Sequence, residues 1–318
     1  MSTVRTPFIE SDLNVLSKHN SVKVCIGSGP VQMIRVIQGV LHAQIVFCWF
    51  ASVYAAVAVL TATLLKKKSI IVVGGVDVAR EREFNYGLWL SPWKSTLVGA
   101  ALKRADRVLV VDQSLRDEIL ARVEYGGKNL EVLPTGYDPD FWQPSGPREP
   151  VVLTVADARN EARLKVKGID ILFDVARRLP RVRFMLVGHD TSRFKELVAP
   201  ANLVLHAPVD QATLLGYYQG SKVYCQPSRR EGLSNTLCES MLCGCIPAAT
   251  DVGGSGRAIG DCGILVPAGD PGALAEAIER ALAMPESAGS KARDRIVALF
   301  PRKQREKRLS ELIAEISR

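Results

Sequence analysis

Histidine is scarce in this sequence, and the cysteines form no metal-binding or redox motif. Four histidines occur among the 318 residues, and these are His19, His42, His189 and His206. The seven cysteines lie scattered in apolar surroundings, and the closest pair, Cys243 and Cys245, has one residue between its members. Because metal and thiol–disulfide motifs use other spacings, we expect neither kind of site. An odd number of dispersed cysteines is typical of a reducing compartment.

An apolar leader is also missing, because the first ten residues are mainly polar, so we expect no signal peptide here. Residues 43–65 form one long uncharged run, and three lysines follow it. The run is long enough for a membrane helix of about 20 residues. The alternative is a buried strand over 44–50 and a core helix over 53–65, which Gln44, Ser52, Thr61 and Thr63 favour. We therefore expect a cytoplasmic protein, soluble or held on the inner membrane face by charge.

The chain is basic, since 41 Lys and Arg against 33 Asp and Glu give a formal net charge of +8. Such a charge favours anionic partners: nucleotides, nucleic acids or membrane surfaces. The basic residues are dispersed and do not alternate with aromatic ones, which argues against nucleic acid. The densest group begins the helix predicted over 302–316, where it either contacts an anionic membrane or faces solvent: Arg302, Lys303, Arg305, Lys307 and Arg308.

Apolar runs alternate with amphipathic segments along the chain, which predicts an α/β protein with parallel sheets. The length allows two domains of about 150 residues each, and residues 144–150, rich in proline, read as a linker. We predict an N-terminal domain over 1–145, a second domain over 146–290 and a helical segment over 291–318. A helix is expected over 7–19 and a strand over 22–26. Gly27-Ser28-Gly29 opens no GxGxxG motif and reads as a turn.

Residues 226–254 are the most informative stretch, because they predict a strand, a loop, a short helix and a second strand. Two carboxylates, Glu231 on the loop and Glu239 in the helix, have seven residues between them. The free N–H groups that begin the helix would face an anion. Phosphates at the helix and hydroxyl groups at the carboxylates suit a sugar nucleotide. Alternatively, Thr236 and Glu239 form a capping box and Glu231 is merely solvated.

This stretch resembles the E-x7-E signature region of the retaining glycosyltransferase family 4, of the glycogen synthase and sucrose synthase superfamily. The resemblance rests on Pro227, Ser228, Glu231, Gly232, Glu239, Gly244, Pro247, Gly253 and Gly254. It implies the GT-B fold, in which two Rossmann-like domains face a cleft. It also implies metal-independent transfer of a sugar from a nucleotide diphosphate sugar to an acceptor hydroxyl, without a cofactor. Relatives begin with a strand that is missing or very short here.

The family's roles are carried over residue by residue. Glu239 is expected at the ribose hydroxyls and Glu231, as a catalytic residue, near the donor sugar. Lys167-Gly168 resembles the family's Lys-Gly pair, whose lysine holds the donor diphosphate. The arginine that usually precedes this lysine is displaced, and Asp157 stands near its position. The other expected donor contacts are Gly232, Leu233, Thr236, Leu237, Arg163, Arg159 and His189.

The acceptor side is less clear in the sequence. Many relatives carry a histidine where this chain has the loop 74–77, so Asp77 is the nearest polar candidate for catalysis. The alternative is a solvated turn. Residues 80–93 either line the acceptor cleft or cover the sheet edge. Asp138 and Asp140 imitate a metal-binding DxD motif, but the proline between them favours a turn.

Two other functions remain open from the sequence. The missing strand, the missing histidine and the displaced arginine are compatible with a non-catalytic protein that binds sugar nucleotides or glycans. A GT-B epimerase acting on a sugar nucleotide is the other alternative. The acceptor of a transferase of this kind is a glycan, a lipid-linked sugar or a small molecule.

Overall fold

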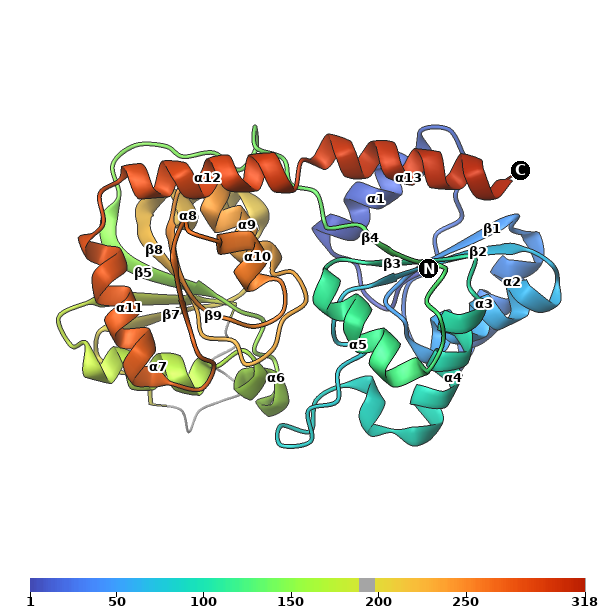
Figure 1. Cartoon of the computed structure of the whole chain (residues 1–318), viewed down its shortest axis with the longest axis horizontal. Coiled ribbons are helices and arrows are strands. Elements are labelled where there is room, and N and C mark those ends of the chain that lie inside the picture. Colours follow the sequence, from blue (N-terminus) through green and yellow to red (C-terminus); the bar gives the residue numbers. More distant parts are fainter. Residues whose placement is uncertain (189–197, 318) are drawn as a thin grey trace. The chain divides into compact units, whose positions relative to one another are not determined.

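The computed structural model describes residues 1–188 and 198–317 and divides into two compact units (Figure 1). Unit 1 comprises Met1–Gly136 together with Arg302–Arg318, and unit 2 comprises Tyr137–Pro301. The change of unit therefore falls before the predicted linker at 144–150. The segment predicted over 291–318 is divided, because its first part belongs to unit 2 and its last helix to unit 1.

Unit 1 is built on a parallel sheet with the strand order β1-β2-β3-β4. Its strands are β1 (Ile45–Trp49), β2 (Lys68–Val73), β3 (Arg107–Val110) and β4 (Leu130–Val132). Its helices are α1 (Pro7–Ser17), α2 (Pro30–His42), α3 (Val53–Leu64), the 3-10 turn η1 (Leu88–Leu90), α4 (Pro92–Arg104), α5 (Gln113–Val123) and α13 (Arg302–Ser317). The strands and helices alternate, which confirms the α/β prediction for this half.

The first strand of unit 1 is reduced to one bridge. Ser2 pairs in parallel with Ile26, and on the other side the Trp49 amide donates to the Met1 carbonyl at 2.9 Å. The strand predicted over 22–26 is wrong, because Ile26 is its only bridging residue. Val22 and Val24 are exposed.

The uncharged run at 43–65 forms strand β1 and helix α3, as the alternative to a membrane helix predicted. Cys48, Ala55, Val59 and Ala62 along this run are almost fully buried and belong to the core of unit 1. Within the described residues, none of the helices combines the length and apolar character that crossing a bilayer requires.

Unit 2 has a six-stranded parallel sheet with the order β10-β9-β8-β5-β6-β7. Its strands are β5 (Glu149–Val155), β6 (Arg183–Val187), β7 (Leu203–His206), β8 (Ser221–Gln226), β9 (Ile246–Thr250) and β10 (Ile264–Val266). Its helices are α6 (Glu161–Val166), α7 (Ile169–Arg178), α8 (Gln211–Gly220), α9 (Asn235–Leu242), α10 (Ser255–Ile259), α11 (Pro271–Ala283) and α12 (Ser287–Leu299). The strand order reverses between β5 and β8, where doubly wound sheets bind their ligands.

The terminal helix α13 is fixed to unit 1 by a buried ion pair. The guanidinium of Arg305 donates to both carboxylate oxygens of Asp12 on α1, at 2.8 and 2.6 Å. It also donates to the carbonyls of Leu133 and Pro134, and the Trp49 indole N–H donates to Asp12 at 2.9 Å. Other basic side chains of this helix lie close to carboxylates, namely Arg302, Lys307 and Arg308. The basic group seen in the sequence is therefore largely used in ion pairs, and membrane contact stays a prediction.

Candidate active site

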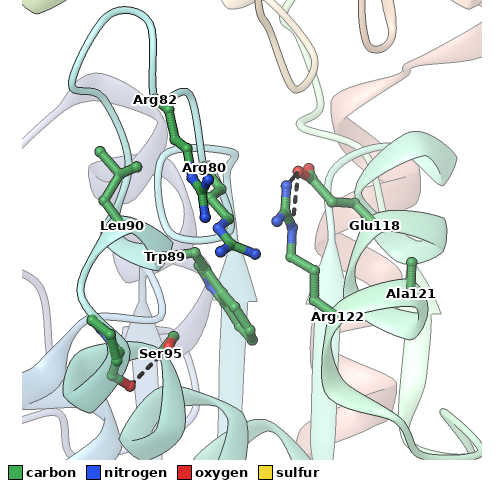
Figure 2. Close-up of a pocket in the computed structure, with 9 residues that line it drawn as sticks. Arg80, Arg82, Trp89, Leu90, Ser95, Glu118, Ala121 and Arg122 are labelled. Carbon is green, nitrogen blue, oxygen red and sulfur yellow. Dashed lines mark hydrogen bonds and ion pairs between the residues drawn. The ribbon is translucent and has the colours of Figure 1, made fainter.

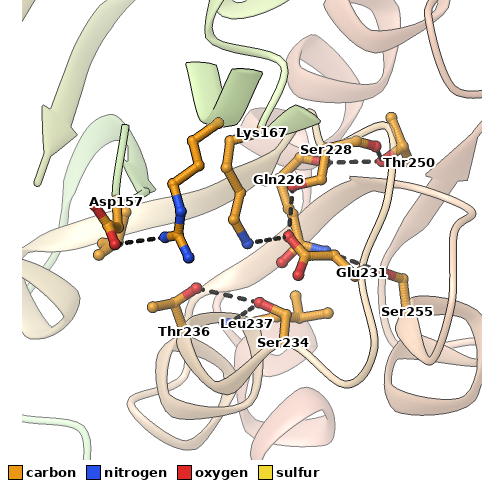
Figure 3. Close-up of polar contacts among 12 residues, drawn as sticks. Asp157, Lys167, Gln226, Ser228, Glu231, Ser234, Thr236, Leu237, Thr250 and Ser255 are labelled. Atoms are coloured by element: carbon orange, nitrogen blue, oxygen red, sulfur yellow. Dashed lines mark hydrogen bonds and ion pairs between the residues drawn. The ribbon is translucent and has the colours of Figure 1, made fainter. Parts of the chain in front are cut away.

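Two predicted catalytic residues meet at the switch point of unit 2 (Figure 3). Lys167 comes from the connection after β5 and Glu231 from the connection after β8. The Lys167 ammonium donates to Glu231 Oε1 at 2.6 Å, and the side chains are 27% and 10% exposed. Because β5 and β8 are neighbours in the sheet, Lys167 and Glu231 form a hydrogen bond although 64 positions separate them in the sequence. The alternative of a solvated Glu231 is wrong.

Gly168 explains how the lysine reaches this position. Its φ of +66° lies in the left-handed region, and an added Cβ would lie 1.9 Å from the Pro227 carbonyl oxygen. Only glycine therefore allows α7 to begin against the loop after β8. The Arg229 amide also donates to the Val166 carbonyl at 2.8 Å. These backbone contacts fix Lys167 relative to Glu231.

Hydrogen bonds hold the loop that carries Glu231. The Ser228 hydroxyl donates to Glu231 Oε1 at 2.7 Å, and the Thr250 hydroxyl donates to the Ser228 carbonyl. The Gly254 amide donates to the Gly232 carbonyl at 2.6 Å, which ties the loop to the glycine-rich segment after β9. Gly232 therefore serves the loop through its backbone, and Leu233 beside it is buried.

The N-terminus of α9 lies beside the ion pair (Figure 3). Its N-cap is Ser234, whose hydroxyl oxygen lies 3.4 Å from the Leu237 amide nitrogen. The capping box predicted for Thr236 and Glu239 is wrong, because the cap stands two residues earlier. Within the described part of the chain, the amides of Asn235 and Thr236 have no protein acceptor. Two N–H groups at the positive end of a helix dipole suit an anion.

Glu239 lies on α9 and is half-buried in unit 2. The Tyr218 hydroxyl donates to its Oε2 at 3.3 Å. Burial raises the pKa of Glu239 to about 8, and the Tyr218 hydrogen bond offsets part of that rise. Further hydrogen-bond donors at this carboxyl group would favour its charged form and lower the pKa again.

Three tyrosines around α9 escaped the sequence analysis. Besides Tyr218, the Tyr224 hydroxyl donates to the Thr236 hydroxyl oxygen at 2.7 Å, and the Tyr137 hydroxyl donates to Asn235 Oδ1 at 2.9 Å. Tyr218 and Tyr224 end up beside the helix because they lie on α8 and β8. In the sequence, Tyr218 and Tyr224 lie just before residues 226–254, and this position was the only hint that they contact α9. Tyr224 is explained equally well as part of a buried apolar strand.

Arg159 and Arg163 are the two candidates for the arginine that the family places before the lysine, and both bind Asp157. Arg159 and Arg163 both form ion pairs with this carboxylate, which lies after β5. Burial alone would raise the pKa of Asp157, but the hydrogen bond from Arg159 and the charges of Arg163, Arg159 and Lys167 outweigh it and lower the pKa. Arg163 lies on α6, a short helix between β5 and α7. Neither arginine is locked in the core, since their side chains are 59% and 30% exposed.

Asp77 lies in unit 1 and is buried, so the alternative of a solvated turn is wrong. Its carboxylate accepts hydrogen bonds from the amides of Ala51, Gly74 and Gly75 at 2.6 to 3.1 Å. Burial raises the pKa of Asp77, and these amides partly offset that effect. The geometry assigns Asp77 a role in shaping the loop after β2, and its catalytic role stays untested.

The remaining predictions concern a metal site at Asp138 and Asp140 and a donor contact by His189. Asp138 Oδ1 accepts from the Asp140 amide at 3.0 Å, so this pair forms a turn. No group of three or more possible metal ligands occurs among the residues that the structure describes. His189 lies outside the described residues.

Comparison with known proteins finds a glycosyltransferase likeness in the second half of the chain. The family described as "Glycosyl transferases group 1" matches residues 149–284. The matched residues make up less than half of the chain and lie within unit 2. They contain Lys167, Glu231 and Glu239, so the site described above lies inside the part of the chain that carries the family likeness.

Two relatives are D-inositol 3-phosphate glycosyltransferases, from Xylanimonas cellulosilytica and Gordonia bronchialis. Each is 28% identical, over 198 and 212 residues, which cover 54% and 57% of this chain. The matched regions span about half of each relative, 48% and 46%. The sequence similarity to these glycosyltransferases thus covers little more than half of the chain.

Solved structures extend the likeness to both units. Sucrose-phosphate synthase from Thermosynechococcus elongatus has a TM-score of 0.75 at 20% identity, over 91% of this chain and 80% of that one. Anabaena Alr3699/HepE, solved in complex with UDP, has a TM-score of 0.74 at 15% identity, over 95% and 89%. The two units therefore have the GT-B fold, as the resemblance in the sequence implied.

Proposed function

We propose that this protein is a retaining glycosyltransferase that moves a sugar from a nucleotide diphosphate sugar to an acceptor hydroxyl. One observation carries the proposal: the Lys167–Glu231 ion pair lies at the switch point, beside a helix N-terminus with two unused N–H groups. This arrangement offers positive charge where a diphosphate leaves and carboxylates where sugar hydroxyls bind. The names of the relatives and the UDP complex of the structural neighbour support the same reaction class.

In the proposed reaction, Lys167 and the N-terminus of α9 bind the diphosphate. The acceptor oxygen forms a bond to the anomeric carbon on the face from which the diphosphate departs. The C–O bond to the diphosphate breaks, and a phosphate oxygen takes the acceptor proton. The charge that develops on the diphosphate is stabilised by fixed donors, which is the main requirement of such a site. No metal is needed for this step, because Lys167 and the helix N–H groups supply the positive charge.

Glu239 is proposed to accept hydrogen bonds from the ribose hydroxyls and Glu231 to contact the donor sugar. Arg163 and Arg159 are proposed to turn from Asp157 to the phosphates when the donor binds, because guanidinium groups bind phosphate in a bidentate manner. The base, the sugar and the acceptor are left open at this point.

A panel of nucleotide sugars tests the proposal. Thermal shift identifies the donor, and NMR of the products, with and without EDTA, gives the anomeric configuration and the metal requirement. Transfer or slow hydrolysis with a retained configuration in EDTA supports the proposal. Conversion of free donor into an isomeric nucleotide sugar would assign an epimerase, and binding without turnover over a broad acceptor panel would assign a binding protein.

A further inference from the structure

The outer face of helix α2 is apolar and lies open to solvent. On the inner face, Val36 and Val40 are buried in the core that α2 shares with α3. On the outer face, Val31, Ile34 and Leu41 are 62%, 58% and 53% exposed. Their spacing places them along one stripe of the helix, and Figure 1 shows α2 at the outer margin of unit 1. Large apolar side chains gathered on a surface mark a site of contact with another molecule.

The turn after α3 extends this apolar stripe. Leu64, at the end of α3, is 85% exposed, and Leu65 beside it is 42% exposed. Lys67 joins the turn to α2, because its ammonium donates to the carbonyls of Val40 and Leu41. The two leucines therefore lie close to the C-terminus of α2. The five exposed residues are called the α2 face, and they are Val31, Ile34, Leu41, Leu64 and Leu65.

The surroundings of the α2 face are basic. Residues 13–76 contain six Lys and Arg and no Asp or Glu. Carboxylates of other segments pair with two of the six, Lys18 and Lys68, so four positive charges stay uncompensated. Among the residues that the structure describes, the exposed side chains of Arg35 and Lys66 have no ion-pair or hydrogen-bond partner. Apolar side chains and positive charge on one surface suit an anionic bilayer, whereas a second copy would bring the same charges and be repelled.

We infer that the α2 face docks unit 1 on a lipid bilayer that contains anionic phospholipids. The apolar side chains enter the boundary between head groups and acyl chains, and Arg35 and Lys66 lie among the lipid phosphates. Binding of this kind combines buried apolar area with electrostatic attraction. Each basic residue near an anionic surface raises the bound fraction by roughly fivefold. The inference is independent of the reaction proposed for unit 2.

Two other pairs of cations in unit 1 provide matched comparisons. Arg80 and Arg82, the pocket pair, line an open pocket of about 650 Å³ that shares no residue with the α2 face (Figure 2). Lys303 and Lys307, the α13 pair, are exposed on the terminal helix. If net charge alone governed binding to lipid, removing either pair would weaken binding as much as removing Arg35 and Lys66.

Flotation of the full chain with vesicles tests the inference. The vesicles consist of phosphatidylcholine alone or of equal parts phosphatidylcholine and phosphatidylglycerol. The mixed vesicles should bind the protein at least about tenfold more tightly, and salt at about 1 M should weaken that binding. The charge variant, Arg35→Gln with Lys66→Gln, should lose about tenfold or more. The apolar variant, Ile34→Gln with Leu41→Gln, should lose about as much, and both should keep the parent's melting temperature because the positions are exposed.

Gln substitutions in the pocket pair and in the α13 pair are the controls. Each should change binding by less than about twofold, because charges more than a Debye length of about 8 Å from the lipid are screened. Equal binding to the two kinds of vesicle overturns the inference, as does full binding by the apolar variant or an equal loss in either control. Sedimentation without vesicles covers the other occupant. A dimer that the apolar variant dissociates would assign the α2 face to a second copy and overturn the inference.

Discussion

Lys167 and Glu231 share a hydrogen bond that leaves the lysine with further donors for a ligand. An ammonium group has three N–H donors, and one is used on Glu231 at 2.6 Å. The lysine can therefore keep its carboxylate partner while it meets a diphosphate. Its position is held by that partner before the donor arrives, and such preorganisation is what makes a charge effective in catalysis.

Lys167→Ala should lower turnover by about 10²–10³ while the Michaelis constant changes less, because the diphosphate gains charge in the transition state. Steady-state kinetics on the identified donor measures this. Lys165→Ala is the control, since its ammonium lies 3.4 Å from Asp170 and its side chain is 43% exposed. Unchanged turnover in Lys167→Ala would remove the residue from catalysis. A rise in the Michaelis constant alone would limit it to ground-state binding.

Glu239 should make the stability of the protein depend on pH. Its pKa in the folded protein is about 8, raised by burial from 4.5, so the folded state keeps a proton that the unfolded state loses. The contribution to the free energy of unfolding is fully present below about pH 4.5 and falls, by at most about 1.4 kcal/mol per pH unit, until about pH 8. Urea unfolding at pH 5, 6.5 and 8 should show a smaller decline in Glu239→Gln. Identical pH profiles for the two proteins would contradict the prediction.

Nucleotide binding should release a proton from Glu239. Ribose hydroxyls that donate to the carboxylate favour its charged form, so donor affinity should rise from pH 6 to 8, by up to about tenfold per unit. Calorimetry in buffers of different ionisation enthalpy counts the released protons. Glu239→Gln should lose both the proton release and the pH dependence of affinity. Proton release that persists in this variant would assign the effect to another group.

The sequence singled out Glu231, Glu239 and Lys167 through their resemblance to a family motif, and the structure places Lys167 beside Glu231. Seven residues between two carboxylates, and a lysine before a glycine, are visible without a fold. The sequence missed the tyrosines that contact α9, because Tyr218 reaches Glu239 only through the packing of α8. It also did not reveal that Asp77 is buried, because the three backbone amides that bind its carboxylate come from two separate segments. Contacts between segments that are distant in the sequence leave no periodic pattern of residues by which they could be predicted.

At the scale of elements, the connection between α6 and α7 decides where Lys167 lies. Gly168→Ala places a Cβ 1.9 Å from the Pro227 carbonyl oxygen at a φ of +66°. We expect a loss of about 1–3 kcal/mol in the free energy of unfolding, with lower turnover, because the loop after β8 has to shift. Gly216→Ala, on the exposed side of α8 with nothing within 4 Å of the added Cβ, should instead stabilise by about 0.5–1 kcal/mol. Equal melting temperatures for the two variants would contradict this reading.

Most elements were predictable, and the failures have physical causes. The strand predicted over 44–50 forms β1 and the helix predicted over 53–65 forms α3, because their apolar patterns are strong and polar residues bound them. The strand predicted over 22–26 did not form, since a strand depends on its neighbour as well as on its own residues. Helix α6 went unseen, because six residues are too few to show a helical period.

At the scale of the whole molecule, the buried ion pair joins the two ends of the chain. Arg305→Ala leaves Asp12, whose side chain is 3% exposed, without its cation, which typically costs about 3–5 kcal/mol. Arg308→Ala, on the same helix with a side chain 28% exposed, should cost about 0–1 kcal/mol. Urea unfolding followed by circular dichroism measures both. Similar losses in the two variants would show that the burial of Arg305 is not what matters.

The ion pair between Asp12 and Arg305 also affects the order in which the two units can fold during translation. Asp12 leaves the ribosome early, whereas Arg305 follows it by 293 positions in the chain. Residues 137–301 are contiguous, and domains generally fold as units during translation. Unit 2 can therefore fold first. During that time the N-terminal segment holds the carboxylate of Asp12, whose partner Arg305 has not yet been synthesised. A released fragment of residues 1–301 should contain a protease-resistant unit 2 and a protease-sensitive N-terminal segment. Fusions that delay release of the C-terminus should lengthen that vulnerable interval.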